Sequence, residues 1–80
     1  MAESPVPLSL EEHRELAREL REAEACLREL CDLVAGVYGP DSRATFMFRR
    51  TVESLSRLRR EMQVQAALDL PGGPADEIYV

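Results

Sequence analysis

The sequence predicts an all-α protein, an antiparallel two-helix hairpin that pairs with a second copy to form a four-helix bundle. Two long segments carry apolar residues at helical spacing, and one strong break over residues 37–42 separates them. Because one helix ends and the next begins within about four residues, the two must run back along each other. The chain has 80 residues, near the lower size limit for a self-sufficient core, so pairing of two hairpins is the simplest way to cover their apolar stripes.

The break itself has the residues that end one helix and start another. Gly39 suits the left-handed residue that follows a helix C-terminus, and Pro40 cannot continue a helix. Asp41 and Ser42 are both good N-caps for a second helix. We therefore expect a turn at 39–41 between a helix over about 10–38 and a helix over about 42–69, within a helical hairpin at 9–70.

The first helix begins at Ser9, and Glu12 completes a capping box three residues later. Its apolar positions alternate between spacings of three and four, which is a heptad pattern. These positions are His13, Leu16, Leu20, Ala23, Leu27, Leu30, Val34 and Val37. The pattern widens toward the turn, which is typical of a helix that packs against more than one neighbour.

The second helix has a stripe of period 3.6 that runs from Ala44 to Ala66. Large apolar residues of both helices gather near the turn, so we expect the densest apolar cluster at the hairpin tip. Its members would be Leu30, Val34, Tyr38, Phe46 and Phe48. The residues predicted to form the core and dimer seam are Leu16, Leu20, Leu27, Leu30, Val34, Phe48, Leu55, Leu58 and Met62.

Both ends of the chain lie outside the hairpin. Residues 1–8 contain two prolines and are expected to form an extended arm, and residues 71–80 form a Pro/Gly linker and a short tail. The tail ends in Ile78-Tyr79-Val80, which we expect to fold back onto the bundle or to be disordered. The alternative is a recognition tail that adds a strand to a partner's sheet. The N-terminal sequence is not a secretory signal, and no apolar run approaches a membrane span.

Charge is unevenly spread over the two helices. The net charge is −5, but the first helix has eight acids and four arginines (−4), and the second has six arginines and three acids (+3). Opposite signs favour pairing of the two helices, within a chain or between chains. An acidic total argues against long-range attraction to nucleic acid or to an anionic membrane.

Residues for catalysis are scarce. There is no lysine and no Gly-rich phosphate loop, and the single histidine, His13, has no nucleophile or metal-binding partner nearby in sequence. His13 is interpreted as an ordinary residue at the edge of the seam. Cys26 and Cys31 are interpreted as small buried hydrophobes with free thiols, which indicates a cytoplasmic protein, and an interchain disulfide at Cys31 is the alternative. The sequence predicts no enzyme, no cofactor and no metal site.

Arginines form the most distinctive surface pattern, on the second helix. Arg43, Arg50 and Arg57 recur every seven residues, with Arg49 and Arg60 close by. We expect a solvated face that neutralises the first helix, and the alternative is a phosphate-binding stripe. The predicted function is thus a non-catalytic interaction or assembly module, a homodimer or a binder of a partner's helix. The alternative function is a small nucleic-acid-binding regulator that uses the arginine stripe.

Overall fold

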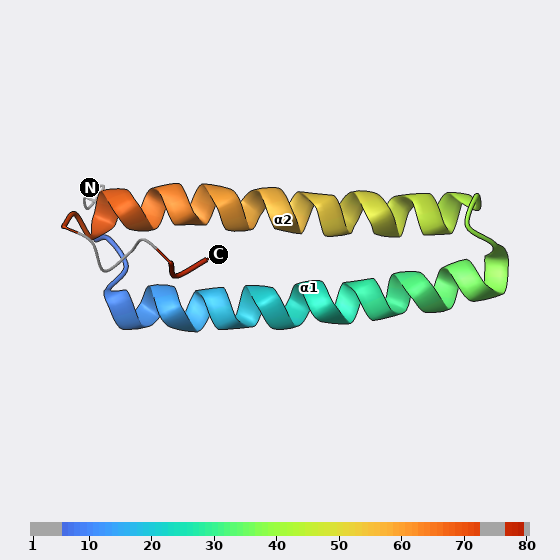
Figure 1. Cartoon of the computed structure of the whole chain (residues 1–80), viewed down its shortest axis with the longest axis horizontal. Coiled ribbons are helices and arrows are strands. Elements are labelled where there is room, and N and C mark those ends of the chain that lie inside the picture. Colours follow the sequence, from blue (N-terminus) through green and yellow to red (C-terminus); the bar gives the residue numbers. More distant parts are fainter. Residues whose placement is uncertain (1–5, 73–76, 80) are drawn as a thin grey trace, which may run out of the picture.

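The computed structural model describes residues 6–72 and 77–79, and these contain two helices and no strand. Helix α1 spans Leu10–Tyr38 and helix α2 spans Arg43–Asp69, and they run antiparallel side by side (Figure 1). The all-α hairpin is therefore confirmed, and α2 begins one residue later than expected. Pairing into a four-helix bundle stays a prediction. The expected arm at 1–8 and the linker and tail at 71–80 lie partly outside the described residues.

Each helix begins at a serine cap. The Ser9 side chain accepts a hydrogen bond from the Glu12 amide at 3.2 Å, and the Glu12 carboxylate accepts one from the Ser9 amide at 3.0 Å. This second bond is the main reason that the pKa of Glu12 is lowered. Ser42 likewise accepts from the Thr45 amide at 3.1 Å and starts α2. The predicted capping box is thus present, and a hydroxyl satisfies one free amide at each helix start.

The turn at the hairpin tip is held by polar bonds. Gly39 has a φ of 94°, a conformation that side chains with a Cβ rarely adopt, and its amide donates to the Ala35 carbonyl at 2.9 Å. Thr45 is fully buried, and its hydroxyl donates to the Gly39 carbonyl at 2.8 Å. Because the tip is closed by these bonds around a threonine, it needs no apolar cluster to form.

The two helices face each other along one regular seam, which we call the interhelical seam. All its members are buried or half-buried, and their spacings alternate between three and four in both helices. On α1 they are His13, Ala17, Leu20, Glu24, Leu27, Cys31 and Val34, and on α2 they are Thr45, Phe48, Val52, Leu55, Arg59, Met62, Ala66 and Asp69.

Two polar pairs cross this seam. His13 Nε2 lies 2.9 Å from Asp69 Oδ2, and Glu24 Oε2 lies 3.7 Å from Arg59 Nε. A slip of α2 by one heptad would place each of these groups opposite an apolar residue and leave it without its partner. Buried polar groups at heptad positions specify register in this way, at a cost in stability. The pairs therefore define which residues of α1 and α2 lie opposite each other.

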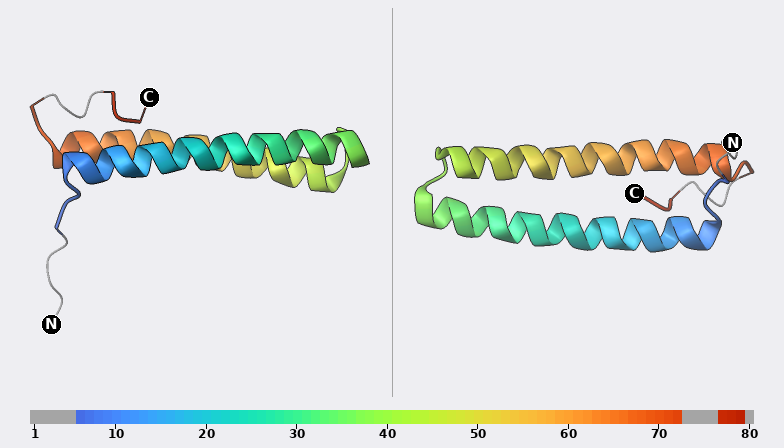
Figure 2. Two further views of the ribbon diagram at one scale, coloured as in Figure 1. Left: turned by 90° about the horizontal axis from the view of Figure 1, so that it is seen from below. Right: turned by 180° about the vertical axis from the view of Figure 1, so that it is seen from behind.

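The apolar core lies at the base of the hairpin, the end opposite the turn. Its buried members are Ala17 and Ala66 from the seam and Ile78 and Tyr79 from the C-terminal tail. Leu10, Leu16, Leu20, Met62 and Leu70 pack against them. Figure 2 shows residues 77–79 of the tail on one side of the helix pair and residues 6–9 on the other.

The prediction of the densest apolar cluster at the tip is wrong for this chain. Tyr38 is 69% exposed, Phe46 is 50% exposed and Leu30 is also exposed, whereas Val34 and Phe48 are half-buried in the seam. Two helices bury only the side chains between them, so large residues on other faces stay in contact with solvent. The base is better buried because the tail supplies a third layer there.

Candidate functional site

A chain of three side chains fastens the C-terminal tail to the base. His13 Nε2 is bonded to Asp69 at 2.9 Å, and its Nδ1 lies 2.8 Å from the Tyr79 hydroxyl. His13 is 0% exposed and Tyr79 is 2% exposed, and their rings meet edge to face at a centroid distance of 5.7 Å. The Asp69 carboxylate accepts from Nε2, so Nδ1 of a neutral ring accepts from the tyrosine hydroxyl. The ring is buried between the two helices and the tail, so these bonds hold the tail against the base.

Two further bonds hold the main chain of the tail. The Arg21 guanidinium of α1 donates to the Ile78 carbonyl at 3.2 Å, and the Tyr79 amide donates to the Gln63 side chain of α2 at 2.9 Å. The tail thus folds back onto the hairpin over its described residues, 77–79, which is one of the two arrangements expected from the sequence. Val80, the last residue of that predicted tail, lies outside the described residues.

The interpretation of His13 as an ordinary seam-edge residue is wrong. Its ring is fully buried at the base end of the seam and joins α1, α2 and the tail. The sequence analysis missed it because its partners lie 56 and 66 positions away. The sequence does contain one signal for this pair. When the heptad pattern of α2 is aligned antiparallel to that of α1 about the turn, Asp69 falls opposite His13.

The electrostatics of the base follow from these bonds. Hydrogen bonds from Gln65 and from His13 lower the pKa of the Asp69 carboxyl. Burial raises the pKa of the Tyr79 phenol, and the neighbouring Asp69 charge adds to this effect. Both shifts favour the state in which Asp69 is ionised and Tyr79 is neutral, which is the state the bonding requires.

A second polar cluster surrounds Glu24, halfway along the seam. Glu24 is buried, and its Oε1 accepts from Arg28 at 2.8 Å and from Ser56 of α2 at 3.0 Å. The Arg28 bond is the largest cause of a lowered pKa of Glu24, and burial opposes it. The cluster ties α1 to α2 through Ser56 and Arg59.

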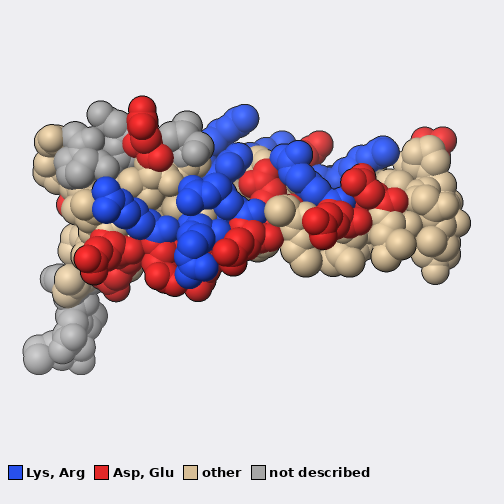
Figure 3. Space-filling view, turned by 60° about the horizontal axis from the view of Figure 1, so that its bottom comes forward, with Lys and Arg blue, Asp and Glu red and all other residues tan. Residues whose placement is uncertain are grey.

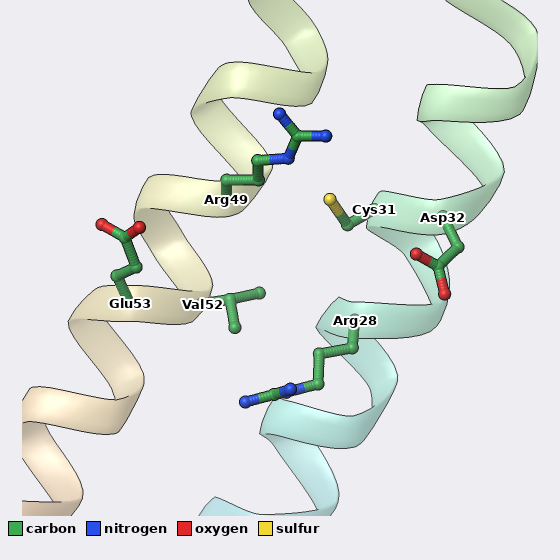
Figure 4. Close-up of a pocket in the computed structure, with 6 residues that line it drawn as sticks. All are labelled: Arg28, Cys31, Asp32, Arg49, Val52 and Glu53. Atoms are coloured by element: carbon green, nitrogen blue, oxygen red, sulfur yellow. The ribbon is translucent and has the colours of Figure 1, made fainter. Parts of the chain in front are cut away.

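A shallow groove of about 400 Å³ lies between the helices on the tip side of Glu24. Arg28, Cys31 and Asp32 line it from α1, and Arg49, Val52 and Glu53 line it from α2 (Figure 4). The Arg49 side chain and the Cys31 sulfur point toward each other across it, and Arg28 reaches toward α2. Cys31 is half-buried here, whereas Cys26 is exposed, so the prediction of a buried thiol is wrong for Cys26.

The five arginines of the predicted stripe are all exposed, as expected of a solvated face. Arg49 donates to the Pro40 carbonyl at 3.3 Å, and the Arg50 guanidinium lies 5.8 Å from the centre of the Phe46 ring. None of the five pairs with a carboxylate of the described residues, where Arg59 forms the interhelical ion pair. On α1, Arg18 pairs with Glu15 and Glu22 of the same helix.

Between Ala23 and the turn on α1, and between the turn and Leu58 on α2, one side of the hairpin forms a second surface, which we call the uncharged face. Nine of its ten residues directly precede a seam position, and Val37 continues the row on α1. Equal offsets from the seam point to the same side of two antiparallel helices, so the two rows lie together. All ten residues are exposed and none is charged. They are Ala23, Cys26, Leu30, Leu33 and Val37 on α1, and Ala44, Met47, Thr51, Ser54 and Leu58 on α2.

Figure 3 shows this distribution of charge. Acidic and basic side chains crowd the part nearer the base, and uncharged atoms gather toward the tip. Residues that directly follow seam positions include Arg28, Asp32, Arg49 and Glu53, so the opposite side of the hairpin is charged. The helix pair therefore has a charged side, which bears the tail and the groove, and on the opposite side an uncharged face in the part nearer the tip.

The predicted core and dimer seam is divided between two surfaces. Leu20, Leu27, Val34, Phe48, Leu55 and Met62 lie in the interhelical seam, half-buried, and Leu16 packs against the base core. Leu30 and Leu58 belong to the uncharged face and are 40% and 44% exposed. The structure therefore brings seven of these residues into contact inside one chain and leaves two on its surface.

Comparison with protein-family models, curated proteins and solved structures found no match to this chain. Within residues 6–72 and 77–79, no helix is both long and apolar enough to cross a membrane. The same residues contain no cluster of three or more side chains suited to hold a metal ion. Fold and surface chemistry thus define a small helical hairpin with two sites of interest, the tail-filled base and the uncharged face.

Proposed function

We propose that the protein is a non-catalytic interaction and assembly module that self-associates through its uncharged face. The observation that carries this proposal is the exposure of large apolar residues on one side of the hairpin. Leu33 is 63% exposed and Val37 is 66% exposed, and Leu30, Met47 and Leu58 lie on the same face. Contiguous exposed apolar surface on a small soluble protein marks an interaction site.

A second copy of the chain is the partner that fits this face. The rows on α1 and α2 both keep heptad spacing, so two hairpins can pack knobs into holes as the halves of a four-helix bundle. In a two-fold pair each copy presents the same surface, and the acidic α1 of one copy can lie against the basic α2 of the other. The small members of the face, Ala23, Ala44, Thr51 and Ser54, leave space for the large ones.

Sedimentation of matched variants tests the proposal. The wild-type chain is expected to be a dimer at micromolar concentration. Leu33→Glu places a charge in the middle of the face and is expected to weaken dimerisation by roughly a hundredfold or more. Val64→Glu is the control, because Val64 is 57% exposed but points away from both the seam and the face. A wild-type chain that sediments as a fully helical 9.0 kDa monomer would contradict the proposal.

Nucleic-acid binding is the second candidate function, and one observation favours it. Arg57 and Arg60 line a groove of about 300 Å³ together with Arg28 from the other helix, and neither pairs with a carboxylate in the described chain. If these groups neutralise phosphates, affinity for RNA or DNA must fall steeply with salt. Replacing Arg50 and Arg57 with Gln would then flatten the salt dependence by roughly one unit per lost contact. We expect a gel shift to show no specific, Arg50-dependent band, because Glu53 lies in the same groove and the total charge is acidic.

A further inference from the structure

The base of the hairpin holds the tail through a set of contacts that suits peptide recognition. Ala17 and Ala66 lie opposite each other in the seam, and their small side chains leave a hollow that Ile78 and Tyr79 fill. Large residues such as Val34 and Phe48 occupy the seam at the other end, where no third segment of the described residues packs. We name the hollow and its polar rim (His13, Ala17, Arg21, Gln63 and Ala66) the base groove.

Each polar contact of the base groove binds a different group of the Ile78-Tyr79 dipeptide. Arg21 binds the carbonyl of the first residue, Gln63 binds the amide of the second, and His13 binds the hydroxyl of the second side chain. The two side chains themselves are buried against the alanines. Main-chain contacts give affinity in such sites, and pockets for side chains give specificity. An aliphatic residue followed by tyrosine is the sequence these contacts select.

We propose that the base groove is a binding site for a segment of a partner protein that carries an aliphatic residue followed by tyrosine. The chain's own tail occupies the site in the absence of that partner. The tail is tethered through a few residues, so its effective concentration at the groove is on the order of millimolar. A partner segment must bind tightly enough to displace a tail present at that concentration. This site is on the charged side of the hairpin and does not depend on self-association through the uncharged face.

The test uses the full-length Tyr79→Ala chain, in which the tail no longer fills the groove. The probe is a fluorescein-labelled synthetic hexapeptide with the sequence of residues 75–80, and binding is followed by fluorescence anisotropy. The probe is expected to bind the variant at least roughly tenfold more tightly than the wild-type chain, whose own tail competes. A probe with phenylalanine in place of tyrosine should bind roughly fivefold more weakly, because the hydrogen bond to His13 is lost. A probe with alanine at that position should not bind.

Two receptor variants and one rescue measurement make the result decisive. Adding Arg21→Ala to the Tyr79→Ala chain should weaken binding of the probe, whereas adding Val64→Ala, outside the groove, should not. If Tyr79→Ala loosens the fold, the probe should restore the melting temperature in proportion to its concentration, since a ligand that binds only the folded state stabilises it. Neither binding nor rescue at millimolar probe would overturn the proposal. Equal rescue by the wild-type full chain would assign the groove to a second copy's tail and overturn the assignment to a partner.

Discussion

The base and the tip of this hairpin contrast in how they treat apolar side chains. The tip has the larger and more numerous apolar residues, among them Tyr38, Phe46 and Met47, yet it leaves them exposed. The base has two alanines in its seam, and there Ile78 and Tyr79 are almost completely buried. Local apolar density therefore does not locate the core in a two-helix protein. Burial depends on whether a third segment is available to cover the helices, and here the tail covers only the base.

The first prediction compares the two tyrosines. Tyr79→Ala is expected to lower the free energy of unfolding by roughly 3–5 kcal/mol, because it removes a buried ring from a very small core. Tyr38→Ala is expected to change it by less than about 0.5 kcal/mol, because that ring is exposed. Urea denaturation followed by circular dichroism measures both. Equal losses would mean that the tip ring is covered in solution, most simply by a second copy.

The second prediction concerns the polar fastening of the base. His13→Leu keeps a side chain in the seam but leaves the Asp69 carboxylate and the Tyr79 hydroxyl without their shared partner. The expected loss is roughly 1–3 kcal/mol, the usual cost of unsatisfied buried polar groups. Arg14→Leu is the control, since Arg14 is the next residue of α1 and is exposed. Similar stability of both variants would show that the ring only fills space.

The third prediction is the pH dependence of stability. Asp69 and Glu24 have lowered pKa values in the fold, so their contribution is complete above the ordinary carboxyl pKa of about 4. This stabilising contribution is lost as the pH falls below that value. Asp69→Asn should therefore make the melting temperature depend less on pH in the acid range. At the alkaline end the raised pKa of Tyr79 opposes ionisation, so stability should fall as the pH rises above about 10.

Thermal melts across this pH range measure both limbs. The Tyr38→Phe variant leaves Tyr79 as the single tyrosine, so its phenolate absorbance reports the tail alone. An alkaline melting curve that is flat above about pH 10 would contradict the burial of that phenol.

The fourth prediction, with the smallest expected effect, concerns the alkylation rates of the two cysteines, which lie on different sides of the hairpin. Cys26 lies on the uncharged face, whereas Cys31 lines the groove on the charged side. Alkylation of Cys26, measured in a Cys31→Ser chain, is expected to slow several-fold as the protein concentration rises through the dimerisation range. Alkylation of Cys31 in the Cys26→Ser chain should not depend on concentration. The opposite pattern would place the dimer interface on the charged side.

Helix bounds and caps could be predicted from sequence because their causes are local. Ser9 with Glu12, and Gly39 with Pro40 and Ser42, decide where helices start and stop within a few residues. The turn then dictates the antiparallel arrangement. These features need no knowledge of distant contacts.

The choice of buried face was harder to predict. Apolar residues on α1 occur in two neighbouring heptad rows, and the row that faces α2 includes Glu24 and His13. Ranking positions by hydrophobicity selected Leu30, which the structure places on the surface, and passed over Ala17. The site at which the tail packs could not be predicted either. It is formed by small side chains and by polar groups that lie far apart in the sequence and come together only in the folded chain.

The mirrored seam has a consequence for changes in chain length. Each added residue within a helix turns everything after it by about 100° relative to the part before it. A single insertion in the middle of α2 would turn the residues after it, so that seam residues would no longer face α1. Residues of the uncharged face or of the charged side would take their place, and His13 would lose its bond to Asp69. Insertions that keep both polar pairs must add a whole heptad to each helix at matching positions. Variants of this hairpin with a different length are therefore expected to differ by complete heptads added in pairs.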